Sequence, residues 1–211
     1  PAMDSRRRTT QECVPAEVPK ARAGEYDLYP IHPVPGGEVG RGYDRLAACL
    51  PETGVVALDG FAGVLWEELR AGLEGALRRM GRSARWIPFA PAFSARGTLD
   101  GLVASSLGGE DPVFGFRFEG ELKDLLDPAG LSSVAGLVLE RGAGCTVVYG
   151  CGAAVAAPGA AVWYAEVPKN EVQFRARAGV PTNLGVSTAL PPKVAYKRSY
   201  FVDWPVLNRH R

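Results

Sequence analysis

The hydrophobic positions of this chain follow two different periods, and the sharpest change between them comes after a short apolar run. The run from Val55 to Leu58 is too short for a helix and predicts a buried strand. Leucines then recur every four residues, which predicts an amphipathic helix over 64–80. Asp59, Gly60 and Gly63 lie between the two elements. A glycine-bearing turn between a strand and a helix is where α/β proteins hold an anion against a helix N-terminus.

The rest of the chain repeats this alternation of short apolar runs and amphipathic stretches. Strands are predicted at 55–59, 84–89, 145–149 and 161–166, and the apolar run at 137–139, bounded by glycine, is a further strand candidate. Helices are predicted at 43–50, 64–80, 98–107 and 170–178, whereas 194–204 is predicted to be extended or mixed. This order predicts an α/β fold with a mainly parallel sheet and helices on both of its faces.

Two parts of the chain differ in composition. Residues 1–24 are polar, charged and without a hydrophobic period, so we expect a flexible N-terminal arm. We expect residues 25–211 to form a single α/β domain, because 46% of the chain is apolar and a core of that size suits one domain. Its first segment, 25–35, contains two internal prolines and is predicted to be an extended edge segment.

Charge and cysteine content narrow the function classes. The formal net charge is +1, so the basic bias of nucleic-acid-binding proteins is missing. No apolar run approaches ~20 residues, and none follows the N-terminal arginines, so neither a membrane span nor a secretory signal is predicted. The four cysteines are Cys13, Cys49, Cys145 and Cys151. They form no C-x-x-C pair and only two histidines accompany them, so we expect no metal site and a reduced, cytoplasmic setting.

The turn after the first strand lies where a phosphate-binding loop lies in P-loop proteins, between a strand and a helix, but it lacks the side chains that such a loop uses. A working loop has the pattern G-x-x-x-x-G-K-[ST], in which the lysine neutralises phosphate charge and the hydroxyl holds magnesium. Here the residues five to seven positions after Gly60 are Leu65, Trp66 and Glu67. Two interpretations remain open: a weak or vestigial anion site, and an ordinary connection between strand and helix.

A second glycine motif, Gly150-Cys151-Gly152, also follows a predicted strand. A dinucleotide-binding fingerprint needs a third glycine and a helix. Val155 takes the place of that glycine, and Pro158 interrupts any helix. We therefore reject a dinucleotide site at this motif.

Later segments supply cations and aromatic residues. Arg175 and Arg177 lie on the helix predicted at 170–178, where they either form a solvated face or reach an anion over the sheet. Lys197 and Arg198 alternate with aromatic residues and either border the same pocket or are edge-strand charges. The phenylalanines at 114, 116 and 118 indicate a strand or a loop that folds over a pocket. His210 is predicted to lie in a tail, and no catalytic triad can be assembled.

Three stretches together resemble known proteins: "VVALDGFAGVLWEEL", "WYAEVPKNEVQFRARAG" and "YKRSYFVDWPVLNRHR". The strand, Asp-Gly turn and helix, the later Gly-Cys-Gly and the second stretch are together similar to degenerate P-loop kinases of the uridine and pantothenate kinase type. More specifically, the first and third stretches resemble the N-terminal kinase-like domain that precedes the catalytic cupin domain in some long bacterial class I mannose-6-phosphate isomerases. The resemblance implies a P-loop-kinase-like fold, a phosphorylated sugar or nucleotide as ligand, and a catalytic cupin domain as partner. Two histidines cannot supply the zinc ligands of the isomerase, so this chain is not the isomerase centre.

Our first hypothesis is an accessory domain that binds a phosphorylated sugar or nucleotide with little or no turnover. The alternatives are an active phosphotransferase, in which Lys197 or Arg175 replaces the missing lysine and Asp59 acts as base or magnesium ligand, and a docking domain without a ligand. We assign no catalytic residue and no cofactor, although a nucleotide with magnesium fits the second hypothesis. The predicted ligand-binding residues are Asp59, Gly60, Gly63, Arg175, Arg177, Lys197 and Arg198. Neither nucleic acid nor a membrane is expected as a partner.

Overall fold

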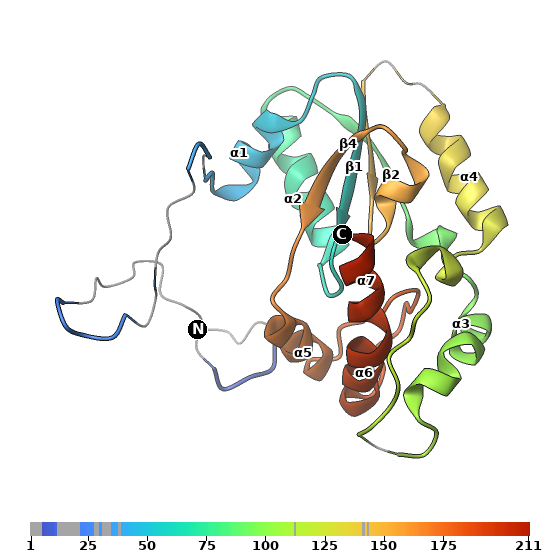
Figure 1. Cartoon of the computed structure of the whole chain (residues 1–211). Coiled ribbons are helices and arrows are strands. Elements are labelled where there is room, and N and C mark those ends of the chain that lie inside the picture. Colours follow the sequence, from blue (N-terminus) through green and yellow to red (C-terminus); the bar gives the residue numbers. More distant parts are fainter. Residues whose placement is uncertain are drawn as a thin grey trace.

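The structure, a computed structural model, describes residues 6–11, 22–27, 30, 35–37, 39–111, 113–140, 142 and 144–211 (Figure 1). Most of the predicted edge segment 25–35 therefore lies outside the described residues. The strands are β1 (Gly54–Gly60), β2 (Ala84–Pro88), β3 (Cys145–Tyr149) and β4 (Ala161–Ala165). The α-helices are α1 (Gly42–Cys49), α2 (Trp66–Arg79), α3 (Arg96–Val103), α4 (Pro128–Leu139), α5 (Lys169–Arg177), α6 (Pro192–Arg198) and α7 (Trp204–His210). Short helical turns are η1 (Ala90–Ala92), η2 (Ala104–Leu107), η3 (Leu122–Leu125), η4 (Ala153–Ala156) and the π-helical η5 (Ser199–Asp203).

The four strands form one sheet in the order β2-β3-β1-β4, and every neighbouring pair is parallel. The register places Val56 opposite Val147 of β3 and Ala161 of β4. The predicted α/β fold with a parallel sheet is thus confirmed, and all four predicted strands are present. Because all the strands run in the same direction, the carboxyl ends of β1, β2 and β3 lie at the same edge of the sheet.

Helices cover both faces of the sheet, as predicted. In β1, Val56 and Leu58 contribute to the core against α1 and α2, whereas Ala57 belongs to the core that includes α4 and η4. Each face of β1 and β3 is buried, and this requires apolar residues at consecutive positions. The uninterrupted apolar run from Val55 to Leu58 is therefore explained by the burial of both faces of β1.

Helix α2 confirms the leucine pattern of the sequence. Leu73 and Leu77 are almost fully buried against the sheet, and full burial of a leucine side chain contributes about 1.5–3 kcal/mol. Glutamates occupy the first turn of the helix and arginines its last turn, so both charges complement the helix dipole. Gly81 follows in the left-handed region (φ 69°), where glycine carries no steric cost.

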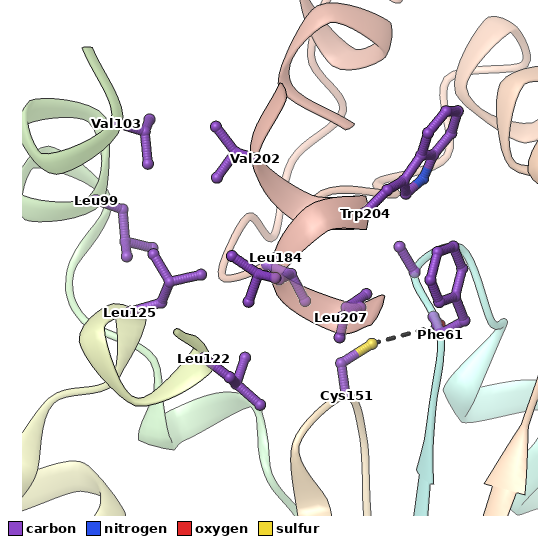
Figure 2. Packing of buried hydrophobic residues seen from close by; sticks show 12 residues of the cluster. Phe61, Leu99, Val103, Leu122, Leu125, Cys151, Leu184, Val202, Trp204 and Leu207 are labelled. Carbon is purple, nitrogen blue, oxygen red and sulfur yellow. Dashed lines mark hydrogen bonds between the residues drawn. The ribbon is translucent and has the colours of Figure 1, made fainter. Parts of the chain in front are cut away.

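A third core lies beyond the carboxyl ends of the strands (Figure 2). It joins Phe61 and Cys151, which follow β1 and β3, to leucines of α3 and η3 and to the C-terminal helices. Trp204 and Leu207 come from α7 and belong to this cluster. The C-terminal segment is thus packed on the edge of the sheet at which a ligand is expected.

Two predictions of secondary structure are wrong. Residues 194–204, predicted to be extended or mixed, are helical throughout, because Pro192 starts α6 and the buried residues Ala195, Val202 and Val206 follow helical spacing. The apolar run at 137–139 is the last turn of α4 rather than a strand. Asp127 caps this helix by accepting a hydrogen bond from the amide of Gly130.

Part of the predicted N-terminal arm contacts the domain. The amide of Arg8 donates to the carbonyl of Phe174 over 3.0 Å, and Arg7 Nε lies 2.8 Å from a carboxylate oxygen of Glu171. Arg6 forms an ion pair with Glu68 of α2. Residues 6–8 therefore lie against α5 and α2. No helix in the described part of the chain is long and apolar enough to cross a membrane.

Candidate anion-binding site

Asp59 occupies the carboxyl end of β1, and its side chain is turned into the protein. Only 1% of the residue is exposed. Oδ1 accepts hydrogen bonds from the amides of Gly60 (2.6 Å) and Gly152 (2.7 Å). Oδ2 accepts one from the amide of Ala154 (3.0 Å) and lies 2.9 Å from Nε2 of His210. Burial opposes ionisation of this carboxyl group, but the hydrogen bonds from His210, Ala154 and Gly152 outweigh it and lower the pKa of Asp59.

The same contacts explain the second glycine motif. The amides of Gly152 and Ala154 point at the carboxylate of Asp59 and are not directed at a ligand. Gly152 has φ 93°, and a Cβ atom there would lie 2.6 Å from the ring of Phe89. The glycines of this motif thus serve close packing and a backbone nest that holds an internal anion.

His210 was predicted to lie in a tail, and that prediction is wrong. It is the last residue of α7 and is mostly buried beside Asp59, although the two residues are 151 positions apart in the sequence. No local pattern in the sequence marks this pairing. Because Asp59 has four hydrogen-bonding neighbours, its carboxylate is fully engaged within the fold.

The turn between β1 and α2 is shaped by its two glycines. A Cβ atom at Gly60 would lie 2.3 Å from the carbonyl oxygen of Ala165. Gly63 has φ 83°, and a Cβ atom there would lie 3.0 Å from the side chain of Val172 in α5. Both positions therefore require glycine, because neighbouring strands and helices approach the backbone closely.

This turn leaves a run of backbone donors without partners. The amides from Ala62 to Glu67 donate no hydrogen bond to any residue that the structure describes. The last three belong to Leu65, Trp66 and Glu67, at the start of α2, and no side chain caps this end of the helix. Free amides at a helix N-terminus carry a partial positive charge and attract anions.

A cavity of about 250 Å³ lies in front of the turn. It is bounded by the turn, by the carboxyl ends of β2 and β3, and by the loop 181–187. Thr182 of that loop is 5% exposed, and its hydroxyl has no hydrogen-bonding partner among the described residues. A buried hydroxyl of this kind is costly unless something binds it.

The acid beside the cavity, Glu67, is held in place. Tyr149 Oη donates to it over 2.7 Å and Arg70 Nε over 2.9 Å. The hydrogen bond from Tyr149 is the main cause of the lowered pKa of Glu67, and burial followed by this hydrogen bond raises the pKa of Tyr149 to about 12. The negative charge of Glu67 is thus partly neutralised where an anion would approach.

Of the four predicted cations, Arg175 lies at the turn. Its Nη1 donates to the carbonyl of Gly63 over 2.6 Å, and its Nε lies 3.3 Å from the carboxylate of Glu171. Arg177, two residues further along α5, is exposed and lies over the ring of Phe174 at 5.7 Å. Neither arginine lines the cavity, and only Arg175 contacts the turn, through the carbonyl of Gly63.

Lys197 and Arg198 lie elsewhere. Lys197 donates to the backbone carbonyl of Asp111. Arg198 is 2% exposed and donates to Asp100 Oδ1 (3.1 Å) and to the carbonyl of Leu184 (3.0 Å). It also faces the buried carboxylate of Asp203 at 3.7 Å, and burial raises the pKa of Asp203 to about 6 despite this cation. Arg198 thus supports the loop that lines the cavity without facing the cavity itself.

The structure therefore brings Gly60, Gly63 and Arg175 together and places Asp59 directly behind them. Trp66 and Glu67 stand where a phosphate loop has its lysine and hydroxyl, and Trp66 packs against the core. No group of three or more His, Cys, Asp or Glu residues in the described ranges could hold a metal ion. These residues do not fit the magnesium–triphosphate chemistry of a P-loop enzyme.

Comparison with known proteins gives one match. The family model of a domain of unknown function (DUF8485) matches residues 42–211, which include the whole sheet and the candidate site. No curated protein and no solved structure matches the chain.

Proposed function

We propose that this chain, which belongs to the DUF8485 family, is an accessory α/β domain that binds a small phosphorylated ligand at the Gly63 turn without turning it over. The observation that carries the proposal is the run of amides from Ala62 to Glu67 that have no acceptor among the described residues. All of these residues except Leu65 line a cavity at the carboxyl edge of a parallel sheet. In open parallel sheets, ligands bind beyond this edge.

The charges around the turn favour a weakly bound anion. Six backbone amides and the N-terminus of α2 attract a phosphate group. Arg175 is close enough to add a charge-assisted hydrogen bond once it exchanges the Gly63 carbonyl for a ligand oxygen. Glu67 opposes an anion, but its carboxylate already accepts hydrogen bonds from Tyr149 and Arg70.

The size and polarity of the cavity favour a sugar phosphate over a nucleotide. A volume of about 250 Å³ is below the ~300–1,000 Å³ that is usual for sites of drug-sized ligands. The unpartnered hydroxyl of Thr182 and the carboxylate of Glu67 suit the hydroxyl groups of a sugar. A phosphate at the turn amides would leave those hydroxyl groups facing these two side chains.

The proposal of binding without turnover follows from the state of Asp59. A general base or magnesium ligand needs a free carboxylate oxygen in the site, and both oxygens of Asp59 are engaged inside the fold. The phosphotransferase alternative requires Lys197 or Arg175 to replace the missing lysine. ATP consumption that depends on magnesium and is lost in Asp59→Ala would favour that alternative.

The resemblance to the N-terminal domain of long mannose-6-phosphate isomerases supports two further parts of the proposal. The domain would act beside a catalytic cupin domain, and mannose 6-phosphate is the first ligand to test. A cytoplasmic setting agrees with the three described cysteines, Cys49, Cys145 and Cys151, all of which are free thiols.

Calorimetric titration with mannose 6-phosphate, inorganic phosphate and mannose tests the proposal. We expect weak binding of the two phosphates and none of mannose. Arg175→Ala should weaken binding about tenfold, since a hydrogen bond to a charged group is worth ~1.5 kcal/mol.

Arg177→Ala is the matched control, because Arg177 lies on the same helix but packs over Phe174, whereas Arg175 donates to the carbonyl of Gly63 in the turn. Thermal melting of both variants would show whether the fold is intact. Equal losses in the two variants would place the site elsewhere, and no binding by the parent protein would favour a docking domain without a ligand.

A further inference from the structure

Two segments that the proposed function does not use meet on the surface of the protein. The loop 108–120 lies along α6 and η5, and the amide of Phe118 donates to the carbonyl of Phe201 over 2.8 Å. Lys197 donates to the carbonyl of Asp111 in the same loop. A Cβ atom at Gly115 would lie 3.0 Å from the ring of Phe201, so the backbone and the ring are in direct contact. The loop is therefore held against the helices by several interactions.

The two segments enclose a groove of about 760 Å³ with an apolar lining. Its sides are formed by Val113 and Phe114 from the loop and by Tyr196 and Tyr200 from the helices. These side chains are large and apolar or aromatic, yet they are exposed. The exposed fraction is 63% for Val113, 71% for Phe114, 44% for Tyr196 and 54% for Tyr200. The rings of Tyr196 and Tyr200 lie 6.2 Å apart and thus form a continuous aromatic surface.

Exposed aromatic residues that gather at one groove are characteristic of binding surfaces. Tyrosine and phenylalanine are enriched at the centres of protein–protein interfaces because they bury much apolar area and lose little rotamer freedom. The alternating phenylalanines of the sequence thus have two roles. Phe118 packs against the core, whereas Phe114 and Phe116 remain exposed, at 71% and 72%.

The charges of the groove are of one sign. Lys193 and Lys197 line it, and no acidic residue does. Asp111, in the same loop, accepts hydrogen bonds at its carboxylate from the amides of Val113 and Phe114, both over 2.8 Å. These two bonds, followed by the attraction of Lys197, lower the pKa of Asp111 despite its exposure. The groove is therefore lined by two lysines and by no carboxylate.

We propose that the groove between Phe114 and Tyr200 is a docking site for a protein segment that presents apolar side chains flanked by carboxylates. The apolar side chains would cover the aromatic surface, and the carboxylates would pair with Lys193 and Lys197. A protein segment fits better than a nucleic acid, because two lysines and a chain net charge of +1 are too little for phosphate-dominated binding. The groove shares no lining residue with the cavity at the Gly63 turn, so this site is independent of the proposed function.

Selection from a random 12-residue peptide library on the immobilised full chain tests the proposal. We expect enriched peptides that combine leucine, isoleucine or phenylalanine with aspartate or glutamate. Single peptides, measured by fluorescence anisotropy, should lose at least tenfold in affinity for Phe114→Ser and for Lys193→Glu. Leu139→Ser is the matched control, because Leu139 is 78% exposed at the far end of α4 and should leave binding unchanged.

All three positions are exposed, so the substitutions should not unfold the protein, and melting curves check this. The proposal is overturned if no peptide is enriched, if enriched peptides lack acidic residues, or if Phe114→Ser binds them as the parent does. A concentration-dependent dimer in sedimentation, lost in Phe114→Ser, would identify a second copy as the occupant instead. Binding of a 12-nucleotide oligothymidine that is lost in the same variant would assign the groove to nucleic acid.

Discussion

Asp59→Asn tests how the carboxyl end of β1 is built. Asparagine keeps the size of the side chain but replaces one acceptor oxygen with an NH₂ group. In one orientation, its oxygen can still accept from the amides of Gly60 and Gly152, and the NH₂ group then faces the amide of Ala154, which is also a donor. The other orientation sets the NH₂ group against two amides and is worse.

The expected loss follows from these contacts. One buried amide without a partner costs about 1–3 kcal/mol. The charge-assisted interaction with His210 is weakened as well, and such bonds contribute about 1.5–3 kcal/mol. We therefore expect Asp59→Asn to lose roughly 2–5 kcal/mol of unfolding free energy at pH 7. His210→Ala removes one of the four neighbours of Asp59 and should cost less.

Urea unfolding followed by tryptophan fluorescence measures this loss as a lower midpoint with an unchanged m-value. The pKa of Asp59 is lowered in the folded protein, so its stabilisation is present above the ordinary value of 3.8 and is lost as the pH falls through the folded pKa. The difference between parent and variant should therefore shrink on acidification below about pH 4. A loss under 0.5 kcal/mol at pH 7, or a difference that does not change with pH, would refute this description of Asp59.

Two further predictions concern the turn and the buried thiol. Gly63→Ala and Gly159→Ala both place alanine at a positive φ, which costs about 1–2 kcal/mol, but only Gly63 is packed against Val172. Gly63→Ala should therefore be the less stable variant in urea by a further ~1 kcal/mol or more, and equal midpoints would contradict the packing of α5 on the turn. Burial, with the nearby charge of Asp59 as a second cause, raises the pKa of Cys151 to about 12. Peptide mapping after iodoacetamide treatment should thus find the exposed Cys49 modified in the native protein and Cys151 only after unfolding; rapid native modification of Cys151 would contradict its burial.

The parts of the fold that could be predicted from the sequence are those with a local cause. The apolar run of β1 is continuous because both faces of the strand are covered, and the leucine spacing of α2 follows from a single buried face. The turn between them was found because glycine is needed wherever a backbone is approached closely, as at Gly60 and Gly63.

The parts that could not be predicted depend on contacts between distant segments. His210 meets Asp59 across 151 positions, and no spacing in the sequence encodes this. Arg198 looks like a surface cation but is buried because Asp203 and the carbonyl of Leu184 surround it. The C-terminal segment contains Val, Tyr, Phe and Trp, which favour strands, and tertiary packing of its helical face overrides that propensity.

The central claim is that the amides of the Gly63 turn bind a phosphate group, and nuclear magnetic resonance tests it most directly. In ¹⁵N–¹H spectra, titration with mannose 6-phosphate should give its largest shifts at the amides from Ala62 to Glu67, and inorganic phosphate should shift the same signals. Mannose at equal concentration should shift none of them. The account is contradicted if these amides stay unchanged, or if the largest shifts fall on Gly152 and Ala154, whose amides already donate to Asp59.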